Sequence, residues 1–163
     1  MSSPNPRGPA SPGVSVILAL VLATISFFAL AVFGLGALSV ATDRDIIAVP
    51  GLGQVPGAVG MLAAVVAFAL SLWGSLRRSH PSFLAVPAVA LATALAHLVV
   101  LWIAVAVASG DLIVATVVAG DLVRGGASAV LLAAGAIAAW GGIALRRTRA
   151  QQPQWPWERD DEE

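Results

Sequence analysis

The sequence has no cysteine, no lysine and no tyrosine, and charged residues make up only 11% of its 163 residues. The absence of cysteine excludes disulfide scaffolds, thiol redox enzymes, iron–sulfur clusters and thiolate zinc sites. The absence of lysine excludes the nucleotide-binding P-loop, which needs a Gly-Lys pair. The net charge of +0, with no long basic stretch, argues against nucleic acid as a partner.

Apolar residues are abundant instead. Hydrophobic residues make up 58% of the chain, and the mean hydropathy is +0.89. Soluble globular domains carry about 25% charged residues, so this chain has too few to cover a surface that faces water. We therefore expect an integral membrane protein and not a soluble enzyme. The residue pattern predicts no catalytic residue, no metal site and no cofactor.

Four stretches are long and uncharged enough to cross a bilayer as helices, which takes about 20 apolar residues. They are residues 14–40, 57–76, 83–108 and 126–145, and His97 is their only titratable side chain. The first stretch is longer than the apolar core of a secretory signal, which spans about 7–15 residues, so we interpret it as an uncleaved helix. The predicted fold is all-α: a four-helix transmembrane bundle with disordered cytoplasmic termini.

Residues 109–125, between the third and fourth stretches, allow two interpretations. Their apolar run, residues 112–119, is too short to cross a bilayer. It forms either a short interfacial or re-entrant helix capped by Asp111, or an outward extension of the fourth span in which Asp121 and Arg124 pair at i, i+3. The repeated Gly-Asp-Leu favours an N-cap role for both Asp111 and Asp121. We favour a solvated turn for Asp121 and Arg124.

The distribution of arginine predicts the orientation of the chain. Two arginines, Arg44 and Arg124, lie in the loops after the first and third spans. The other seven lie on the opposite side of the membrane: Arg7, Arg77, Arg78, Arg146, Arg147, Arg149 and Arg159. Cytoplasmic loops of membrane proteins are enriched in arginine and lysine. We therefore predict a multi-pass protein of the cell (plasma) membrane with both termini in the cytoplasm.

His97 is the one ionisable residue within the spans, where such residues mark functional sites by default. It could relay protons, bind haem or contact a substrate, and Thr93 shares its helix face. The alternative is a neutral histidine that forms a hydrogen bond with a backbone carbonyl or hydroxyl of a neighbouring helix. We favour this alternative, because no Asp or Glu lies within the spans to form a relay.

The two ends of the chain differ from the membrane domain, residues 14–145. Residues 1–13 form a Pro-rich leader that we expect to be disordered. The tail, residues 146–163, begins with basic residues and ends with acidic ones. Its Trp-Pro-Trp segment is unusual, because bulky apolar side chains are scarce in disordered tails.

Three interpretations of the tail remain open. Trp155 and Trp157 could fill pockets of a partner protein while Glu158 and Asp160 meet its basic rim. Alternatively, the arginines could bind anionic lipid while the tryptophans insert at headgroup level. The tail could also be inert. We favour docking to a cytoplasmic or membrane protein.

The chain resembles small uncharacterised four-span membrane proteins of high-GC Gram-positive bacteria. The resemblance rests on the four-span layout and on the tail segment Trp155-Pro156-Trp157-Glu158-Arg159-Asp160. The richness in alanine, valine and arginine is typical of bacteria with GC-rich genomes. The resemblance implies no activity.

We predict a non-enzymatic membrane accessory or scaffold protein, with the lipid bilayer and a tail-bound protein as its partners. The alternative is a small transporter or transporter subunit, which would be a homo-oligomer because four spans leave little room for a pathway within one chain. His97, Asp121 and Arg124 would then form its polar path.

Overall fold

The computed structural model describes residues 14–43, 53–78 and 81–147, and the regular structure in these ranges is entirely helical. Five helices follow one another: α1 (Val16–Thr42), α2 (Val55–Leu76), α3 (Ala85–Ser109), α4 (Leu112–Arg124) and α5 (Ala127–Arg147). Helices α1, α2, α3 and α5 are long and apolar enough to cross a membrane. The predicted all-α bundle is confirmed, and each of these helices begins and ends within two residues of a predicted stretch.

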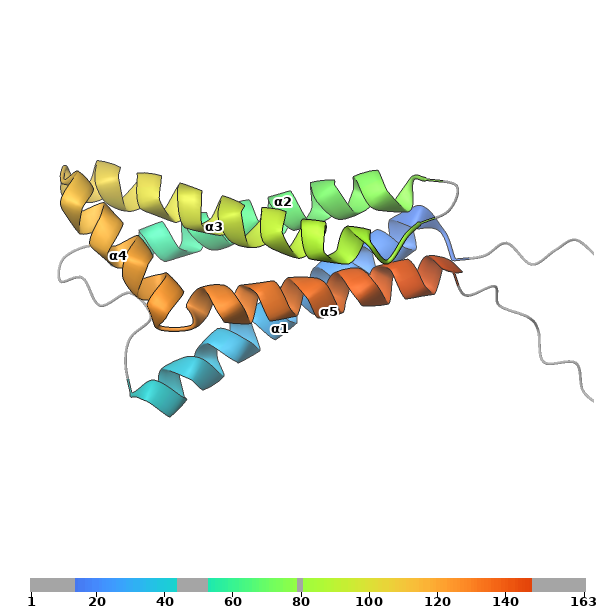
Figure 1. Cartoon of the computed structure of the whole chain (residues 1–163), viewed down its shortest axis with the longest axis horizontal. Helices are drawn as coiled ribbons and strands as arrows, with labels where there is room; N and C mark the ends of the chain where they lie inside the picture. Colours follow the sequence, from blue (N-terminus) through green and yellow to red (C-terminus); the bar gives the residue numbers. More distant parts are fainter. Residues whose placement is uncertain (1–13, 44–52, 79–80, 148–163) are drawn as a thin grey trace, which may run out of the picture.

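The four long helices lie side by side, and α4 crosses one end of the bundle (Figure 1). Helix α2 packs mainly on α3, and α1 mainly on α5, while α3 and α5 join the two pairs. The chain enters α1 and leaves α5 at the end opposite α4 (Figure 1). An even number of spans places both exits at the same end of the bundle.

Local signals set the helix boundaries. The Ser15 hydroxyl accepts a hydrogen bond from the Leu18 amide at 3.1 Å, which caps the N-terminus of α1. Helix α3 ends at Gly110, whose φ of 68° suits a glycine C-cap, and its amide donates to the Ala106 carbonyl at 2.9 Å. Gly126 has a φ of 90°, so the chain can turn sharply between α4 and α5.

The core between the helix pairs is built from residues four apart. In α1 the buried residues are Ala19, Ala23, Phe27 and Ala31, and in α2 a similar row includes Ala64, Phe68 and Leu72. Rows at this spacing run obliquely along a helix, so helices that pack through them cross at an angle. Figure 1 shows α1 crossing α5 in this way. At the centre of the core, the rings of Phe27 and Phe68 stack with centroids 4.6 Å apart.

Small residues bring the helices close together. A Cβ added to Gly135 would lie 3.3 Å from the Cα of Ala90, across the α3–α5 contact. A Cβ added to Gly142 would lie 2.9 Å from the Cβ of Ala23, across the α1–α5 contact. Without a hydrophobic driving force between helices in lipid, such close contact supplies the packing energy.

Helix α4 settles the interpretation of residues 109–125. It is a separate helix capped by Asp111, whose side chain accepts from the amides of Ile113 at 2.7 Å and Val114 at 3.3 Å. The alternative of one long helix with the fourth span is wrong, because the chain turns at Gly125 and Gly126. The N-cap role predicted for Asp121 is also wrong. Asp121 lies in the last turn of α4, and not in a turn that precedes α5.

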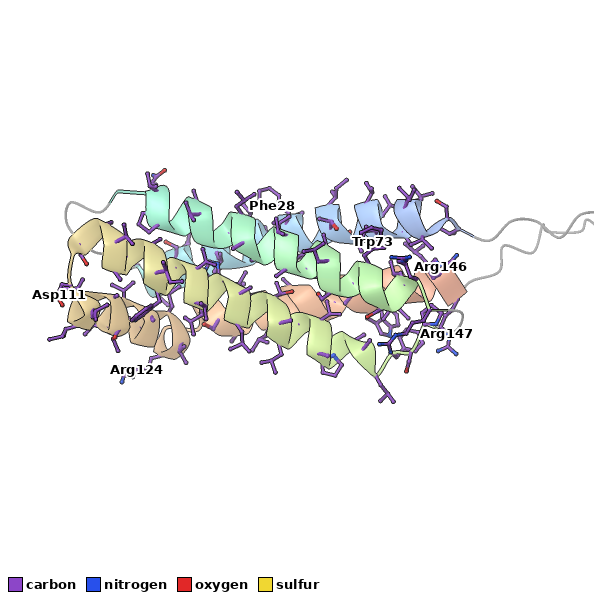
Figure 2. All side chains as sticks on the ribbon, turned by 90° about the horizontal axis from the view of Figure 1, so that it is seen from above. Phe28, Trp73, Asp111, Arg124, Arg146 and Arg147 are labelled. Carbon is purple, nitrogen blue, oxygen red and sulfur yellow. The ribbon has the colours of Figure 1, made fainter. Side chains whose placement is uncertain are left out.

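The outer surface of the bundle is as apolar as its interior. Large hydrophobic side chains project from the long helices over most of their length, such as Phe28, Leu70, Leu95 and Ile137. Figure 2 shows Phe28 pointing away from the ribbon of α1. Such a surface suits lipid and not water. The chain is thus a multi-pass membrane protein by the length and composition of its helices.

Candidate functional site

Four arginines gather at the end of the bundle where the chain enters and leaves it. Arg77 and Arg78 follow α2, and Arg146 and Arg147 end α5. We call this the arginine end; in Figure 2 Arg146 and Arg147 lie there, and Asp111 and Arg124 lie at the opposite end. Within the described ranges the arginine end has no acidic residue. The described residues of this end therefore carry four positive charges and no negative one.

Arg146 connects the two ends of the bundle's sequence. Its Nη1 donates a hydrogen bond to the backbone carbonyl of Val14 at 2.9 Å. Val14 immediately precedes the cap of α1, and Arg146 lies in the last turn of α5. The Nε atom of Arg146 is buried and has no hydrogen-bond partner among the described residues. This contact holds the two exits of the chain beside each other.

Aromatic rings accompany two of the other arginines. The guanidinium of Arg77 lies over the ring of Trp73, 5.3 Å from its centroid. The guanidinium of Arg147 lies 4.9 Å from the ring centroid of Phe83, which in turn stacks on Trp140 at 6.2 Å. Sequence reasoning considered the tail tryptophans and missed these three rings. Their positions beside arginines at the ends of spans were a usable signal, because tryptophan is enriched at membrane interfaces.

His97 lies deep in the bundle. It is 5% exposed and faces α2, where a Cβ added to Gly60 would lie 3.2 Å from its Nδ1 and Cε1 atoms. Its Nδ1 has no well-formed hydrogen bond within the described structure. His97 thus faces the backbone of α2 at Gly60, and the hydrogen bond that the favoured interpretation requires stays a prediction.

Most hydroxyl groups in the spans bond within their own helix. Thr93, one turn before His97, is buried and donates to the Val89 carbonyl at 2.8 Å. Thr24 donates to the Leu20 carbonyl at 2.8 Å. Further hydroxyls follow the same pattern: Thr42, Ser71, Ser75 and Ser109. Such bonds satisfy the hydroxyls without directing them at a ligand.

The opposite end of the bundle holds the other predicted polar residues. Arg124 and Asp121 are brought together on α4, with Nη1 and Oδ1 4.0 Å apart, and both side chains are largely exposed. His97 does not join them, because it is enclosed by the bundle and faces Gly60. The structure therefore unites two of the three residues of the predicted polar path and separates the third.

Helix α4 is fastened to α3 by its apolar face and by one side-chain hydrogen bond. Ala115, Val118 and Leu122 pack with Leu101 in a second, smaller core. The indole Nε1 of Trp102 donates to the Thr116 hydroxyl at 3.2 Å. The remaining predicted site residues, Trp155, Trp157, Glu158 and Asp160, lie outside the described residues, as do the leader 1–13 and most of the tail.

A model of the family of unknown function DUF6121 matches residues 14–163. The chain belongs to this family. Neither a curated protein nor a solved structure matches it. The region matched by the DUF6121 model begins at Val14 and includes the whole bundle. Val14 is the residue whose carbonyl accepts the hydrogen bond from Arg146. The matched region also takes in the tail but not the leader.

Membership of DUF6121 agrees with the expectation of a protein without an assigned activity, and it adds no chemistry to the site. In the described ranges, no three histidine, aspartate or glutamate side chains gather as they would to hold a metal ion. The most distinctive polar feature of this DUF6121 member is therefore its arginine end, with the chain exits between the arginines.

Proposed function

We propose that the protein is a non-enzymatic accessory or scaffold protein of a bacterial plasma membrane. Its bundle would anchor the chain, and its tail would recruit a cytoplasmic or membrane protein. The observation that carries this proposal is the Arg146–Val14 hydrogen bond at the arginine end. This bond supports the proposal because it holds the last turn of α5, which the tail follows, in place beside the start of α1.

The positive charge of the arginine end supports a cytoplasmic location for both termini. Arginine-rich ends remain on the cytoplasmic side during insertion. The described residues of the opposite end include Asp43, Asp111 and Asp121 with the single cation Arg124. The described ends thus differ by four arginines to one, which is the bias that the positive-inside rule associates with a cytoplasmic arginine end.

The interior of the bundle supports anchoring more than catalysis or transport. The Phe27–Phe68 stack and its aliphatic neighbours fill the centre, and most of the described hydroxyls bond to their own helices. In the proposal, binding specificity resides in the tail. Trp155 and Trp157 would enter apolar pockets, and Glu158 and Asp160 would face a basic rim.

Affinity purification in mild detergent with mass spectrometry tests the docking role. The wild-type chain is compared with a Trp155→Ala, Trp157→Ala double variant and with a Gln151→Ala, Gln152→Ala control in the same tail. Loss of two anchor residues weakens binding by at least about 2 kcal/mol, so the partner should be missing from the tryptophan variant alone. An identical set of proteins in all three samples would contradict the docking role.

The alternative function, a small oligomeric transporter or transporter subunit, has one observation in its favour: the buried Nδ1 of His97 has no hydrogen-bond partner among the described residues. Proton flux into proteoliposomes discriminates the two functions. As an accessory protein, the wild-type chain should pass no more protons than the His97→Ala and Asp121→Asn variants. A flux that disappears in these variants, with the fold retained, would favour the transporter.

A further inference from the structure

One face of α5 near the arginine end combines a cation with two aromatic rings. Arg147 lies over Phe83, and Phe83 stacks on Trp140. Trp140 and Arg147 are seven residues apart in α5, which is close to two full turns, so they project from the same face. Phe83 reaches this face from the segment just before α3. The cluster therefore joins the α2–α3 connection to the last turns of α5.

An apolar strip continues from this cluster toward the middle of the bundle. Trp140 is 58% exposed, and Ile137, one turn earlier in α5, is 59% exposed. Both side chains would face lipid if α5 crosses the membrane. A molecule lying along this strip would have its apolar part against Ile137 and Trp140. Its other end would reach Arg147.

Arg147 is equipped to bind a phosphate at that position. It is exposed, and the described part of the chain offers it no carboxylate partner, since the one ion pair found there is Arg124 with Asp121. A guanidinium that lies over a ring keeps its N–H groups free in its own plane, where they can donate two hydrogen bonds to phosphate oxygens. The ring of Phe83, with its centroid 4.9 Å from the guanidinium carbon, adds a cation–π contact.

We propose that Arg147, Phe83 and Trp140 form a binding site for an anionic phospholipid. The phosphodiester of the headgroup binds Arg147, Trp140 lies at the level of the headgroup and glycerol, and an acyl chain follows Ile137. Free phosphate shares the charged chemistry but cannot use the apolar strip, so the site selects lipid. This proposal is independent of the docking role of the tail, because the site is built from α5 and the α2–α3 connection.

Native mass spectrometry of the full chain in detergent tests the site, with phosphatidylglycerol and phosphatidylcholine as probes. The wild-type chain should bind phosphatidylglycerol more tightly than phosphatidylcholine. Arg147→Gln should weaken phosphatidylglycerol binding about fivefold, since one arginine near an anionic surface contributes about 1 kcal/mol. Arg124→Gln is the matched control: it removes one exposed arginine at the other end and should leave the affinity unchanged.

Two further measurements separate this site from a general effect of charge. Phe83→Leu keeps the total charge but removes the ring beneath Arg147, and should weaken phosphatidylglycerol binding about threefold. Millimolar inorganic phosphate should not displace the lipid. Equal affinities of Arg147→Gln and Arg124→Gln, unchanged binding in Phe83→Leu, or displacement by inorganic phosphate would each overturn the proposal.

Discussion

The guanidinium of Arg146 donates a 2.9 Å hydrogen bond to the carbonyl oxygen of Val14, across 132 positions of sequence. The bond joins the last turn of α5 to the residue that precedes the cap of α1. Helix α1 packs mainly on α5 through apolar residues, and this hydrogen bond lies at the end of their interface. The bond also fixes the point from which the tail leaves the bundle.

Replacement of Arg146 by methionine should destabilise the bundle, because the Val14 carbonyl loses a charged donor. Hydrogen bonds to charged groups contribute about 1.5–3 kcal/mol to stability. Because Arg146 is partly exposed, we expect the free energy of unfolding to fall by an amount near the lower value. Unfolding by SDS in mixed micelles measures it. Arg78→Met, which removes an exposed arginine at the same end, should change the free energy of unfolding by less than about 0.5 kcal/mol. Equal effects of the two variants would contradict the structural role of Arg146.

The stacked rings of Phe27 and Phe68 predict a large difference between two neighbouring phenylalanines. Phe27 is fully buried, whereas Phe28 is 49% exposed on the outer face of α1. Phe27→Ala leaves a cavity and should lower the free energy of unfolding by at least about 2 kcal/mol. The loss is one of packing energy, because a helix that separates from the bundle is still surrounded by apolar lipid. Phe28→Ala, measured in the same SDS titration, should be nearly neutral. A larger effect of Phe28→Ala would contradict the helix orientation.

Gly60 is expected to be coupled to His97. A Cβ at Gly60 would lie 3.2 Å from two imidazole atoms, so Gly60→Ala should destabilise the α2–α3 contact by about 1 kcal/mol. The cost should shrink when His97 is also alanine, giving a coupling of about 0.5–1 kcal/mol in a double-mutant cycle. Gly74→Ala, in the same helix with open space around its Cβ position, is the control and should be neutral or stabilising. Strict additivity of Gly60→Ala and His97→Ala would refute the contact.

The cap at Asp111 should control the stability of α4. Asp111→Ala removes the acceptor of two amide hydrogen bonds and should cost about 1 kcal/mol, seen as faster hydrogen exchange in residues 112–118. Asp121→Ala breaks only an exposed ion pair and should change exchange in α4 by less than about 0.5 kcal/mol. If Asp121→Ala accelerated exchange more than Asp111→Ala, the assignment of the cap would be wrong.

The sequence allowed the four spans to be predicted because each is an uncharged stretch of about the length that a bilayer requires. It could not decide between the two arrangements of residues 109–125. The run before Asp121 is compatible with a short helix or with an extended span, and the decision depends on the φ of 90° at Gly126 and on packing of Val118 and Leu122 against α3. Asp121 was misassigned because its Gly-Asp-Leu context matches that of Asp111.

The contacts of the site depend on helix register, which the sequence does not reveal. The pattern indicated that His97 meets a neighbouring helix. That its neighbour is Gly60 depends on the position of α2 along the axis of α3, which the sequence does not show. The Arg146–Val14 bond likewise depends on the packing of α1 on α5. The aromatic partners of Arg77 and Arg147 were closer to prediction, since charge and aromatic rings coincide at the ends of the same spans.

Cysteine accessibility tests the central claim, that both termini leave a four-span bundle at its cytoplasmic, arginine-rich end. The natural chain has no cysteine, so single substitutions report without background. Thr42→Cys marks the α4 end and Ser82→Cys the arginine end, and both positions are exposed. In intact cells, a membrane-impermeant maleimide should label Thr42→Cys and not Ser82→Cys, and inverted vesicles should give the reverse. Labelling of Ser82→Cys in intact cells, or of both positions from one side, would contradict the account.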